Sequence, residues 1–221
     1  MKLTNIELGE LQEYMRDKSI AVIGNGSCIL NRPYGKLIDS HDIVIRINGG
    51  SPVKNQLKKN IGSKNDIYSV NIDSAPYISR GEGAKYILRL NPKGKNQLDH
   101  HQVKMLNLYP NIYYAFDKVQ KQIKQLSKDE LFNKSRPSTG AWTMEFLVKN
   151  IKFKSISLFG FDFFDEFKER RVGNMFNSNL SSRHTPRGEY NYFKNIMRKY
   201  DITQYYCTCK ECKLCNRKQL P

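Results

Sequence analysis

The chain has 221 residues, of which 39% are hydrophobic and 11% aromatic. This composition is typical of a globular protein with a sizeable core, and it excludes an intrinsically disordered chain. No apolar run approaches the roughly 20 residues that a membrane-spanning helix requires. The first residues, 1–20, are polar and mixed in charge, which is typical neither of a signal peptide nor of a membrane anchor. We therefore expect a cytoplasmic protein.

The net charge is strongly positive, because 37 Lys and Arg residues outnumber 21 Asp and Glu residues and give +16 at pH 7. Such a charge favours anionic partners: nucleic acid, an anionic membrane surface, or nucleotide and acidic-sugar substrates. The lysines are scattered and lack the interleaved aromatic residues of an RNA-binding sheet, which argues against nucleic acid. A solvated basic surface that steers anions is the plainer interpretation, and peripheral contact with an anionic membrane is a second.

Short apolar runs alternate with helical patterns along the chain. The expected strands are 19–23, 42–47, 66–70, 85–90, 111–115 and 155–161, followed by an edge strand at 203–207. The expected helices are 5–18, 116–126, 141–150 and 188–200. This alternation predicts an α/β fold, a single Rossmann-like domain whose mostly parallel sheet has about six or seven strands flanked by helices. We place this domain at residues 1–206, before a basic, cysteine-rich tail at 207–221.

Ligands of such a sheet bind beyond the carboxyl ends of the strands, so the segments that follow strands are the functional candidates. The turn 24–27 (GNGS) follows the first strand, and its glycines let backbone N–H groups approach a phosphate or a ribose. It is not a dinucleotide fingerprint, because the third glycine position is Ile29. Asn48, at the end of the next strand, can read a base or sugar edge or simply cap the strand exit. Asp162 follows the sixth strand between two aromatic residues.

Two further candidates precede helices. In the run 136–140 (RPSTG), hydroxyl groups and free helix N-terminal amides form a cradle for an anion or a ribose, although a plain Ser or Thr N-cap explains the same residues. His184 stands ahead of the last helix, five residues before Glu189. The ordinary pKa of histidine suits it for taking a proton near neutrality, and a surface or capping role is the alternative.

Four of the five cysteines crowd into the tail, at Cys207, Cys209, Cys212 and Cys215. In a cytosolic chain such residues are reduced thiols or metal ligands rather than a disulfide framework. Four thiolates can hold a tetrahedral structural zinc ion. Zinc ribbons, however, pair two separated Cys-x2-Cys knuckles, so the alternative is a last strand followed by tail residues without a metal.

Taken in order, these segments resemble the motifs of eukaryotic-type sialyltransferases. Residues 21–49 (AVIGNGSCILNRPYGKLIDSHDIVIRING) are similar to the long motif, 136–147 (RPSTGAWTMEFL) to the small motif, and 184–189 (HTPRGE) to the very small motif, His-x4-Glu. Residues 160–164 (GFDFF) and 200–209 (YDITQYYCTC) resemble parts of the bacterial sialyltransferases that act on lipooligosaccharide. The resemblance covers most of the chain and implies a GT-A variant of the Rossmann-like fold.

The resemblance also implies an activity. It implies an inverting transfer of an acidic keto sugar, sialic acid or Kdo, from its CMP donor to a hydroxyl of a glycan or glycolipid, with no cofactor and no obligatory metal. His184 would be the general base that deprotonates the acceptor hydroxyl. The implied donor-binding residues are Asn25, Gly26, Asn48, Arg136, Ser138, Thr139, Gly140 and Asp162.

The chain departs from the bacterial pattern at Phe164, where a tyrosine that bonds the leaving phosphate is expected. Phenylalanine has no hydroxyl, so nearby Lys168, Arg170 and Arg171 become the candidates for that phosphate. The His-Tyr or Tyr-Tyr motif of the eukaryotic enzymes is also not identifiable. Losing one such donor costs about 3–4 kcal/mol of barrier. Two alternatives therefore stay open: a catalytically degenerate CMP-binding domain, and a basic nucleic-acid-binding protein with a zinc tail.

Overall fold

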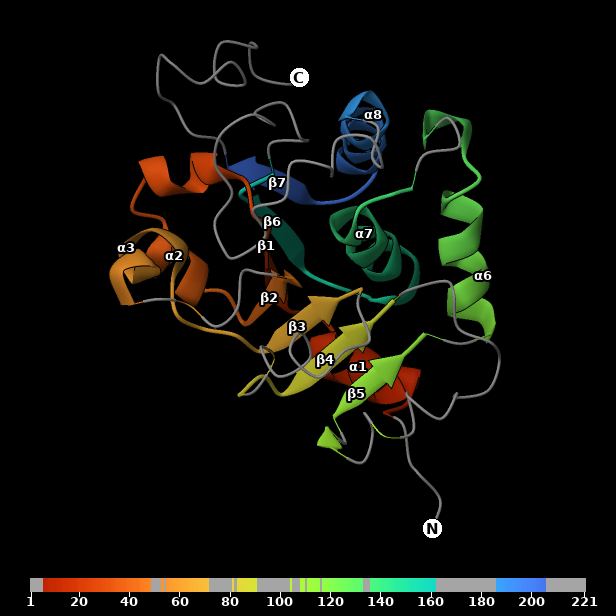
Figure 1. The fold of residues 1–221 in the computed structure, drawn as a ribbon, viewed down its shortest axis with the longest axis horizontal. Helices are drawn as coiled ribbons and strands as arrows, with labels where there is room; N and C mark the ends of the chain where they lie inside the picture. The colour runs from red at the N-terminus through yellow and green to blue at the C-terminus, as the bar shows by residue number, and fades with distance from the viewer. Residues whose placement is uncertain are drawn as a thin grey trace.

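In the computed structural model, the described residues are 6–48, 53, 55–71, 81, 83–90, 104, 108–109, 111–115, 117–132, 136–161 and 186–205. They form one seven-stranded sheet in the order β5-β4-β3-β2-β1-β6-β7. Every strand pairs in parallel with its neighbours (Figure 1). The strands are β1 (Ser19–Ile23), β2 (Ile43–Ile47), β3 (Ile67–Val70), β4 (Tyr86–Arg89), β5 (Ile112–Tyr114), β6 (Ser155–Phe159) and β7 (Ile202–Tyr205). The predicted Rossmann-like α/β fold is confirmed.

Helices cover both faces of this sheet. The α-helices are α1 (Leu8–Met15), α2 (Gly35–Asp39), α3 (Lys58–Ile61), α6 (Asp117–Leu126), α7 (Thr139–Asn150) and α8 (Pro186–Met197). The 3-10 helices are η1 (Ser27–Asn31), η3 (Asn55–Leu57) and η5 (Glu130–Phe132). Helices α1, α6, α7 and α8 share the larger core with one face of the sheet, and α2, α3 and η1 share a smaller core with the other face. None of the helices in the described part of the chain is long and apolar enough to span a membrane.

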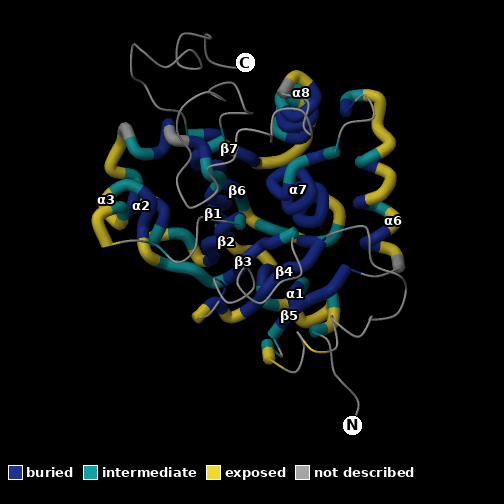
Figure 2. Tube along the Cα trace, in the orientation of Figure 1, coloured by how far each residue is buried: buried dark blue, intermediate teal, exposed yellow. Residues whose placement is uncertain are grey.

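The strand residues alternate between the two cores because successive side chains of a strand point to opposite faces. In β1, Ile20 and Val22 join the larger core, whereas Ala21 and Ile23 join the smaller one. All strands except the edge strand β7 and the first residues of β1 and β6 are fully buried, as the dark tube through the centre of Figure 2 shows. Near-continuous apolar runs such as IVIRI in β2 are what a parallel sheet covered on both faces requires.

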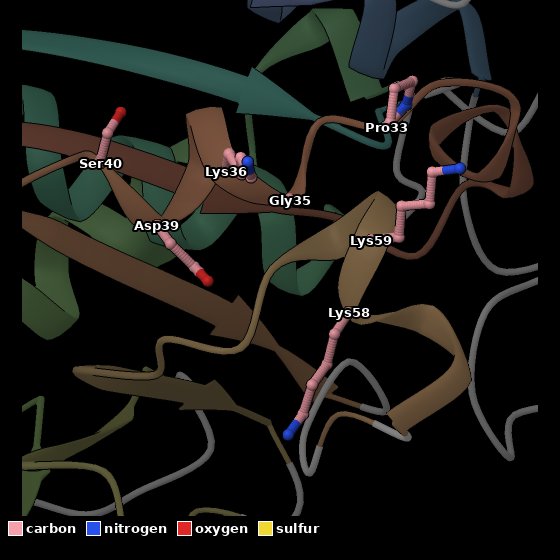
Figure 3. A pocket seen from close by; sticks show the side chains of 7 residues that line it. All are labelled: Pro33, Gly35, Lys36, Asp39, Ser40, Lys58 and Lys59. Carbon is pink, nitrogen blue, oxygen red and sulfur yellow. The ribbon is translucent and has the colours of Figure 1, made fainter.

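Helix α2 packs closely against α3 on the side of the sheet that carries the smaller core (Figure 3). A Cβ atom at Gly35 would collide with the backbone carbonyl of Lys58, so only glycine permits this approach. The two helices have five and four residues. They were not predicted, because segments this short carry no apolar period that distinguishes them from loops.

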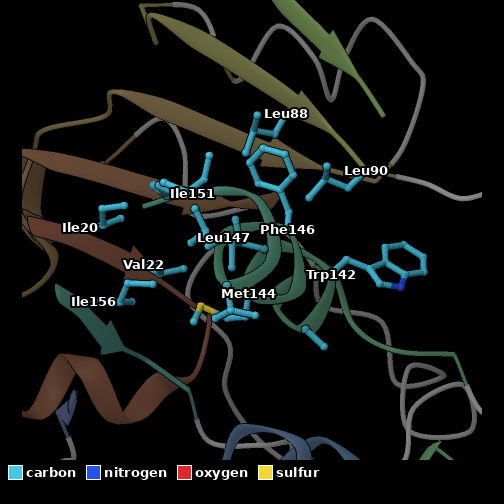
Figure 4. Packing of buried hydrophobic residues seen from close by; sticks show 14 of the residues in the cluster. Ile20, Val22, Leu88, Leu90, Trp142, Met144, Phe146, Leu147, Ile151 and Ile156 are labelled. Atoms are coloured by element: carbon cyan, nitrogen blue, oxygen red, sulfur yellow. The ribbon is translucent and has the colours of Figure 1, made fainter. Parts of the chain in front are cut away.

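Helix α7 is the central helix of the larger core. The sequence indicated one apolar face through Trp142, Phe146 and Ile151, whereas every residue from 139 to 148 is buried. Figure 4 shows its side chains packed among Val22 of β1 and Leu88 of β4. The helix is enclosed because α6 and α8 flank it while the sheet lies beneath it.

Most other boundaries lie within about two residues of the expected ones, and α1 is shorter than its expected span at both ends. Helix α7 begins at Thr139 rather than 141, because the hydroxyl of Ser138 caps it. Helix α8 begins at Pro186 and ends at Met197 rather than running from 188 to 200. The expected edge strand is present as β7, at 202–205. The cysteine-rich tail, 207–221, lies outside the described residues.

Candidate functional site

The direction in which the sheet grows reverses between β1 and β6. Strands β2 to β5 extend to one side of β1, and β6 and β7 lie on its other side. In open α/β sheets the ligand crevice lies at such a reversal, outside the carboxyl ends of the strands. The carboxyl ends here are Ile23 of β1 and Phe159 of β6, which lie side by side in register. The turn 24–27 therefore stands at the position that the fold favours for a ligand.

Three glycines bring the ends of β1 and β6 into close backbone contact. The N–H of Gly24 donates to the carbonyl of Phe159, and the N–H of Gly26 donates to the carbonyl of Gly160, each at 2.8 Å. Gly160 has φ +67, which is left-handed, and a Cβ atom on it would lie 2.8 Å from the carbonyl oxygen of Gly24. A Cβ atom on Gly24 would in turn collide with the carbonyl oxygen of Gly160. The glycines of this turn thus hold β1 against β6. The N–H groups of Gly24 and Gly26 are engaged in this contact and are not free for a phosphate, contrary to the expectation from the sequence.

Two asparagines flank the reversal and leave acceptor atoms free. The side-chain amide of Asn25 donates to the carbonyl of Ile47 at 3.1 Å, and that of Asn48 donates to the hydroxyl of Thr139 at 3.0 Å. The Oδ1 atom of each asparagine is buried and has no hydrogen-bond partner among the described residues. Unsatisfied buried oxygens are rare in folded proteins and commonly mark a place for a water or a ligand. Two such atoms here provide acceptors for the hydroxyl or amino groups of a ligand.

Asn48 also has an unusual backbone conformation. Its φ is +47, in the left-handed region that non-glycine residues seldom adopt. Asparagine tolerates this region better than most residues do. The conformation is combined with the hydrogen bond to Thr139 at the start of α7, and backbone strain of this kind clusters at ligand sites. The side chain of Asn48 thereby joins the end of β2 to the helix N-terminus.

The start of α7 is held by a buried carboxylate. Glu189, in the first turn of α8, accepts hydrogen bonds from the backbone N–H of Ser138 at 2.6 Å and from its hydroxyl at 3.0 Å. The same hydroxyl oxygen accepts the N–H of Ala141 at 3.1 Å, which caps the helix. Ser138 thus performs the capping role that was the structural alternative for it, and it joins α7 to α8. Glu189 was noted only for its spacing from His184, and its link to Ser138 was not expected.

The Glu189 carboxyl titrates close to neutrality. The residue is only 1% exposed, and burial raises its pKa from the ordinary 4.5 to about 7, although the hydrogen bonds from Ser138 lower it in part. The partial positive charge at the N-terminus of α7 favours an anion nearby, and the carboxylate form of Glu189 already supplies one. Its protonation therefore changes the electrostatics of the cradle.

Gly140 and Arg136 complete the N-terminal region of α7. A Cβ atom on Gly140 would lie 2.9 Å from the ring of Phe161, so glycine lets the helix start pack on the exit of β6. That ring packs against Phe193 of α8, with centroids 5.1 Å apart. The guanidinium of Arg136 lies over the indole of Trp142, 4.9 Å from its centroid, a cation–π contact. Arg136 is therefore placed beside the helix N-terminus as expected.

Other residues of the long motif have structural roles. The buried guanidinium of Arg46 donates to the carbonyls of Lys64 at 2.9 Å and Ile61 at 2.8 Å, and burial lowers its pKa to about 10. The carboxylate of Asp39 accepts the N–H groups of Ser63 and Lys64. These contacts fix the connection into β3 on the face of the sheet that carries the smaller core. The arginine of the Arg-x-Asn pattern thus supports the sheet, whereas its asparagine lies at the crevice.

Several site predictions lie outside the described residues. They are His184, Asp162, Lys168, Arg170, Arg171, Cys207, Cys209, Cys212 and Cys215. Within the described ranges there is no group of three or more His, Cys, Asp or Glu residues arranged to hold a metal ion. The described part of the site therefore comprises Asn25, Gly26, Asn48 and the start of α7.

Part of the chain is similar to known sequences. Residues 8–96 match the family model of glycosyltransferase family 29 (sialyltransferase), a stretch that includes the long motif at 21–49. A stretch of 64 residues is 45% identical to beta-1,6-galactosyltransferase GALT29A from Arabidopsis thaliana. That stretch covers 29% of this chain and only 16% of the plant protein.

Comparison with solved structures extends the likeness to most of the chain. The fold matches sialyltransferase CstII from Campylobacter jejuni, solved with the substrate analogue cytidine-5'-monophosphate, with a TM-score of 0.57 and 18% identity, over 91% of this chain and 84% of that one. It also matches a mammalian sialyltransferase in complex with Gal-beta-1-3GalNAc-ortho-nitrophenol, with a TM-score of 0.56 and 19% identity, over 92% of this chain and 74% of that one. The chain therefore has the fold of these sialyltransferases, and residues 8–96 match the model of glycosyltransferase family 29, which confirms the predicted resemblance to sialyltransferase-like glycosyltransferases.

Proposed function

We propose that the chain is an inverting glycosyltransferase of glycan biosynthesis that moves an acidic keto sugar, sialic acid first, from CMP to a glycan hydroxyl. The observation that carries the proposal is the pair of buried, unpartnered amide oxygens of Asn25 and Asn48 at the sheet reversal. A CMP donor presents ribose hydroxyls and a cytosine amino group, which need such acceptors. Its phosphate and carboxylate need donors, and the first-turn N–H groups of Thr139 and Gly140 have no intrahelical partner, whereas that of Ala141 is capped by Ser138.

His184 is the proposed base. It stands five residues before Glu189 in the sequence, and Glu189 is bonded to Ser138 at the start of α7. A neutral imidazole takes the proton of the acceptor hydroxyl while CMP leaves from the opposite side of the sugar. Negative charge then develops on the departing phosphate, and we assign its neutralisation to Lys168, Arg170 or Arg171, with Asp162 near the donor. These charges make a metal ion unnecessary for catalysis.

The experiment measures CMP release by the full chain from CMP-Neu5Ac and from CMP-Kdo, with lactose and lipid-linked galactosides as acceptors and EDTA present. Metal-independent release by the wild type, lost in His184→Ala while CMP binding persists, is the expected result. Release that requires added metal contradicts metal independence. If neither donor is consumed although CMP stabilises the fold, the chain is a degenerate CMP-binding domain, the second candidate that Phe164 favours. Binding of RNA or DNA that weakens with salt, without CMP binding, supports the nucleic-acid alternative.

The plant relative favours one more candidate, galactosyl transfer, because it is a galactosyltransferase that is 45% identical over 64 residues. That identity covers only 16% of the relative, so the donor preference of the whole protein does not follow from it. UDP-galactose is therefore offered in the same assay. Release of UDP with no release of CMP would replace the sialic acid proposal by this one.

We also propose a cytoplasmic location at the periphery of an anionic membrane. A hollow of about 660 Å³ between α2 and α3 is lined by Lys36, Lys58 and Lys59, as Figure 3 shows. The carboxylate of Asp39 in the same hollow is engaged by the N–H groups of Ser63 and Lys64, so the excess charge there is positive. Co-sedimentation with phosphatidylserine vesicles, but not with phosphatidylcholine vesicles, is expected. Equal sedimentation of Lys58→Glu/Lys59→Glu and wild type would contradict this assignment.

A structural zinc ion in the tail is a separate proposal that rests on the spacing of Cys207, Cys209, Cys212 and Cys215. One zinc per purified chain, lost in Cys212→Ser/Cys215→Ser without loss of transfer, is expected. A zinc-free chain would leave the tail as reduced thiols.

A further inference from the structure

A second pocket lies between α6, α7 and α8, with a volume of about 310 Å³. The same two helices that carry the donor cradle, α7 and α8, form half of its wall. Glu189 is bonded at the cradle, and Ile196 lines the pocket seven residues further along α8. At 1.5 Å per residue, the two places are about 10 Å apart along the helix.

The pocket contains a buried carboxylate with unused bonding capacity. Glu145, in the middle of α7, is 9% exposed. Its Oε2 atom accepts a hydrogen bond from the phenolic hydroxyl of Tyr192 at 2.9 Å. Burial, the larger cause, and this contact, the smaller one, raise the pKa of Tyr192 well above its ordinary value. The Oε1 atom has no hydrogen-bond or ion-pair partner within the described ranges. This oxygen can accept a hydrogen bond that a ligand donates.

The charges around the pocket select a neutral ligand. Asp129 and Glu145 contribute two negative charges, and Lys149 and Lys199 contribute two positive charges. A cation or an anion would gain from one pair and be repelled by the other. A polyhydroxylated molecule can donate hydroxyl protons to the carboxylates and accept hydrogen bonds from the ammonium groups. Sugars have this chemistry, because each hydroxyl both donates and accepts.

An exposed aromatic ring completes the pattern. Tyr200, at the rim of the pocket, is 36% exposed and is held by its contact with the ring of Phe153, with centroids 6.2 Å apart. Leu126 and Val148 provide apolar surface to the same hollow. An apolar wall with a few placed polar groups is the usual make-up of a small-molecule site, and an aromatic face can pack against the C–H face of a pyranose ring.

We propose that this pocket binds a neutral hexose unit of the acceptor glycan, outside the unit that receives the transferred sugar. The inference rests on the proposed function for the identity of its ligand, and its geometry stands apart from the donor cradle. A glycan that is already bound at the site of transfer binds this pocket intramolecularly, which raises the affinity for long acceptors over short ones. The Glu145–Tyr192 bond joins α7 to α8 at the pocket, whereas the Ser138–Glu189 contact joins them at the cradle.

The test uses the full chain with labelled methyl groups and lactose as the probe. Lactose is expected to shift the methyl resonances of Leu126, Val148 and Ile196 with a dissociation constant on the order of 1 mM. Tyr200→Ala and Glu145→Gln are each expected to weaken this binding by about tenfold. Leu37→Ala, an exposed substitution on α2, is the matched control and should bind as the wild type does.

Three results would overturn the inference. The first is no methyl shift at saturating lactose, and the second is lactose binding by Tyr200→Ala and Glu145→Gln that equals that of the wild type. The third is methyl shifts with glucosamine but none with lactose, which would assign the pocket to a cation. CMP-induced thermal stabilisation is measured on the same samples and should be equal in all variants. Absence of CMP stabilisation in the wild type contradicts the donor proposal and leaves the methyl result valid, so the two failures are distinguishable.

Discussion

The buried carboxylate of Glu189 accepts two hydrogen bonds from Ser138, one from its backbone N–H and one from its hydroxyl. These residues are 51 positions apart and belong to the very small and the small motif. Their contact fixes the first turn of α8 against the first turn of α7. The segment that holds the proposed base is thereby joined to the proposed donor cradle, and the stability of this junction depends on one titratable group.

The Glu189 carboxyl should make folding pH-dependent. Folding raises its pKa from 4.5 to about 7, which corresponds to about 3 kcal/mol. Since the folded state holds the proton more tightly, this stability is full below pH 4.5 and is lost as the pH rises to about 7. Glutamine does not titrate and can keep both contacts, with its amide oxygen accepting the N–H of Ser138 and its NH2 group donating to the Ser138 hydroxyl oxygen, so Glu189→Gln should lack the slope. Urea unfolding at pH 4.5 and pH 7.5 measures it, and parallel pH profiles of the two proteins would contradict the assignment.

Asn48 should matter for CMP binding more than for folding. Asn48→Gly removes the amide but suits the φ of +47, so the free energy of unfolding should change by less than about 1 kcal/mol. CMP affinity, measured by calorimetry, should fall about tenfold through loss of a ligand hydrogen bond. Asn48→Ala should lose the same affinity and in addition about 1 kcal/mol of stability, because alanine is strained at this φ. Unchanged CMP affinity in both variants would remove Asn48 from the donor site.

Gly160 should be irreplaceable for the closure of β1 on β6. Gly160→Ala places a Cβ atom 2.8 Å from the carbonyl oxygen of Gly24 at a φ of +67, and we expect a loss of about 2–4 kcal/mol. Gly9→Ala is the matched control: it lies in α1 with no atom within 4 Å of the added Cβ, and it should stabilise the chain by about 0.5–1 kcal/mol. Thermal unfolding separates the two. A neutral Gly160→Ala would mean that the backbone can relax at the sheet reversal.

Arg46 should behave as a structural residue. Arg46→Met removes the donors to the carbonyls of Ile61 and Lys64 and should cost about 2–4 kcal/mol of stability. CMP affinity of the folded protein should stay within about twofold of the wild type, because the guanidinium is turned to the β3 connection. Calorimetry with CMP beside urea unfolding gives both values. Lost affinity at preserved stability would instead place Arg46 in the donor site.

The sequence by itself determined the secondary structure that carries the fold. Near-continuous apolar runs such as those of β1 and β2 predicted buried parallel strands, and the motif order predicted the sialyltransferase-like family. Those signals are local, because strand periodicity and turn residues depend on a few neighbouring positions. The all-round burial of α7 and the short α2 and α3 were missed, since burial on every side and helices of four or five residues leave no distinctive period.

Only the tertiary structure decided which motif residues meet. Asn48 and Thr139 are 91 positions apart, and they touch because the strand order brings the exit of β2 to the start of α7. Residues two apart in a strand share a face, so Arg46 and Asn48 would point the same way if β2 continued. The strand ends at Ile47, and the left-handed φ of +47 at Asn48 breaks the alternation, so Asn48 reaches Thr139 while Arg46 reaches the carbonyl of Ile61. Contacts of this kind depend on crossovers between distant segments and on the packing that they permit, and no local pattern along the chain encodes them.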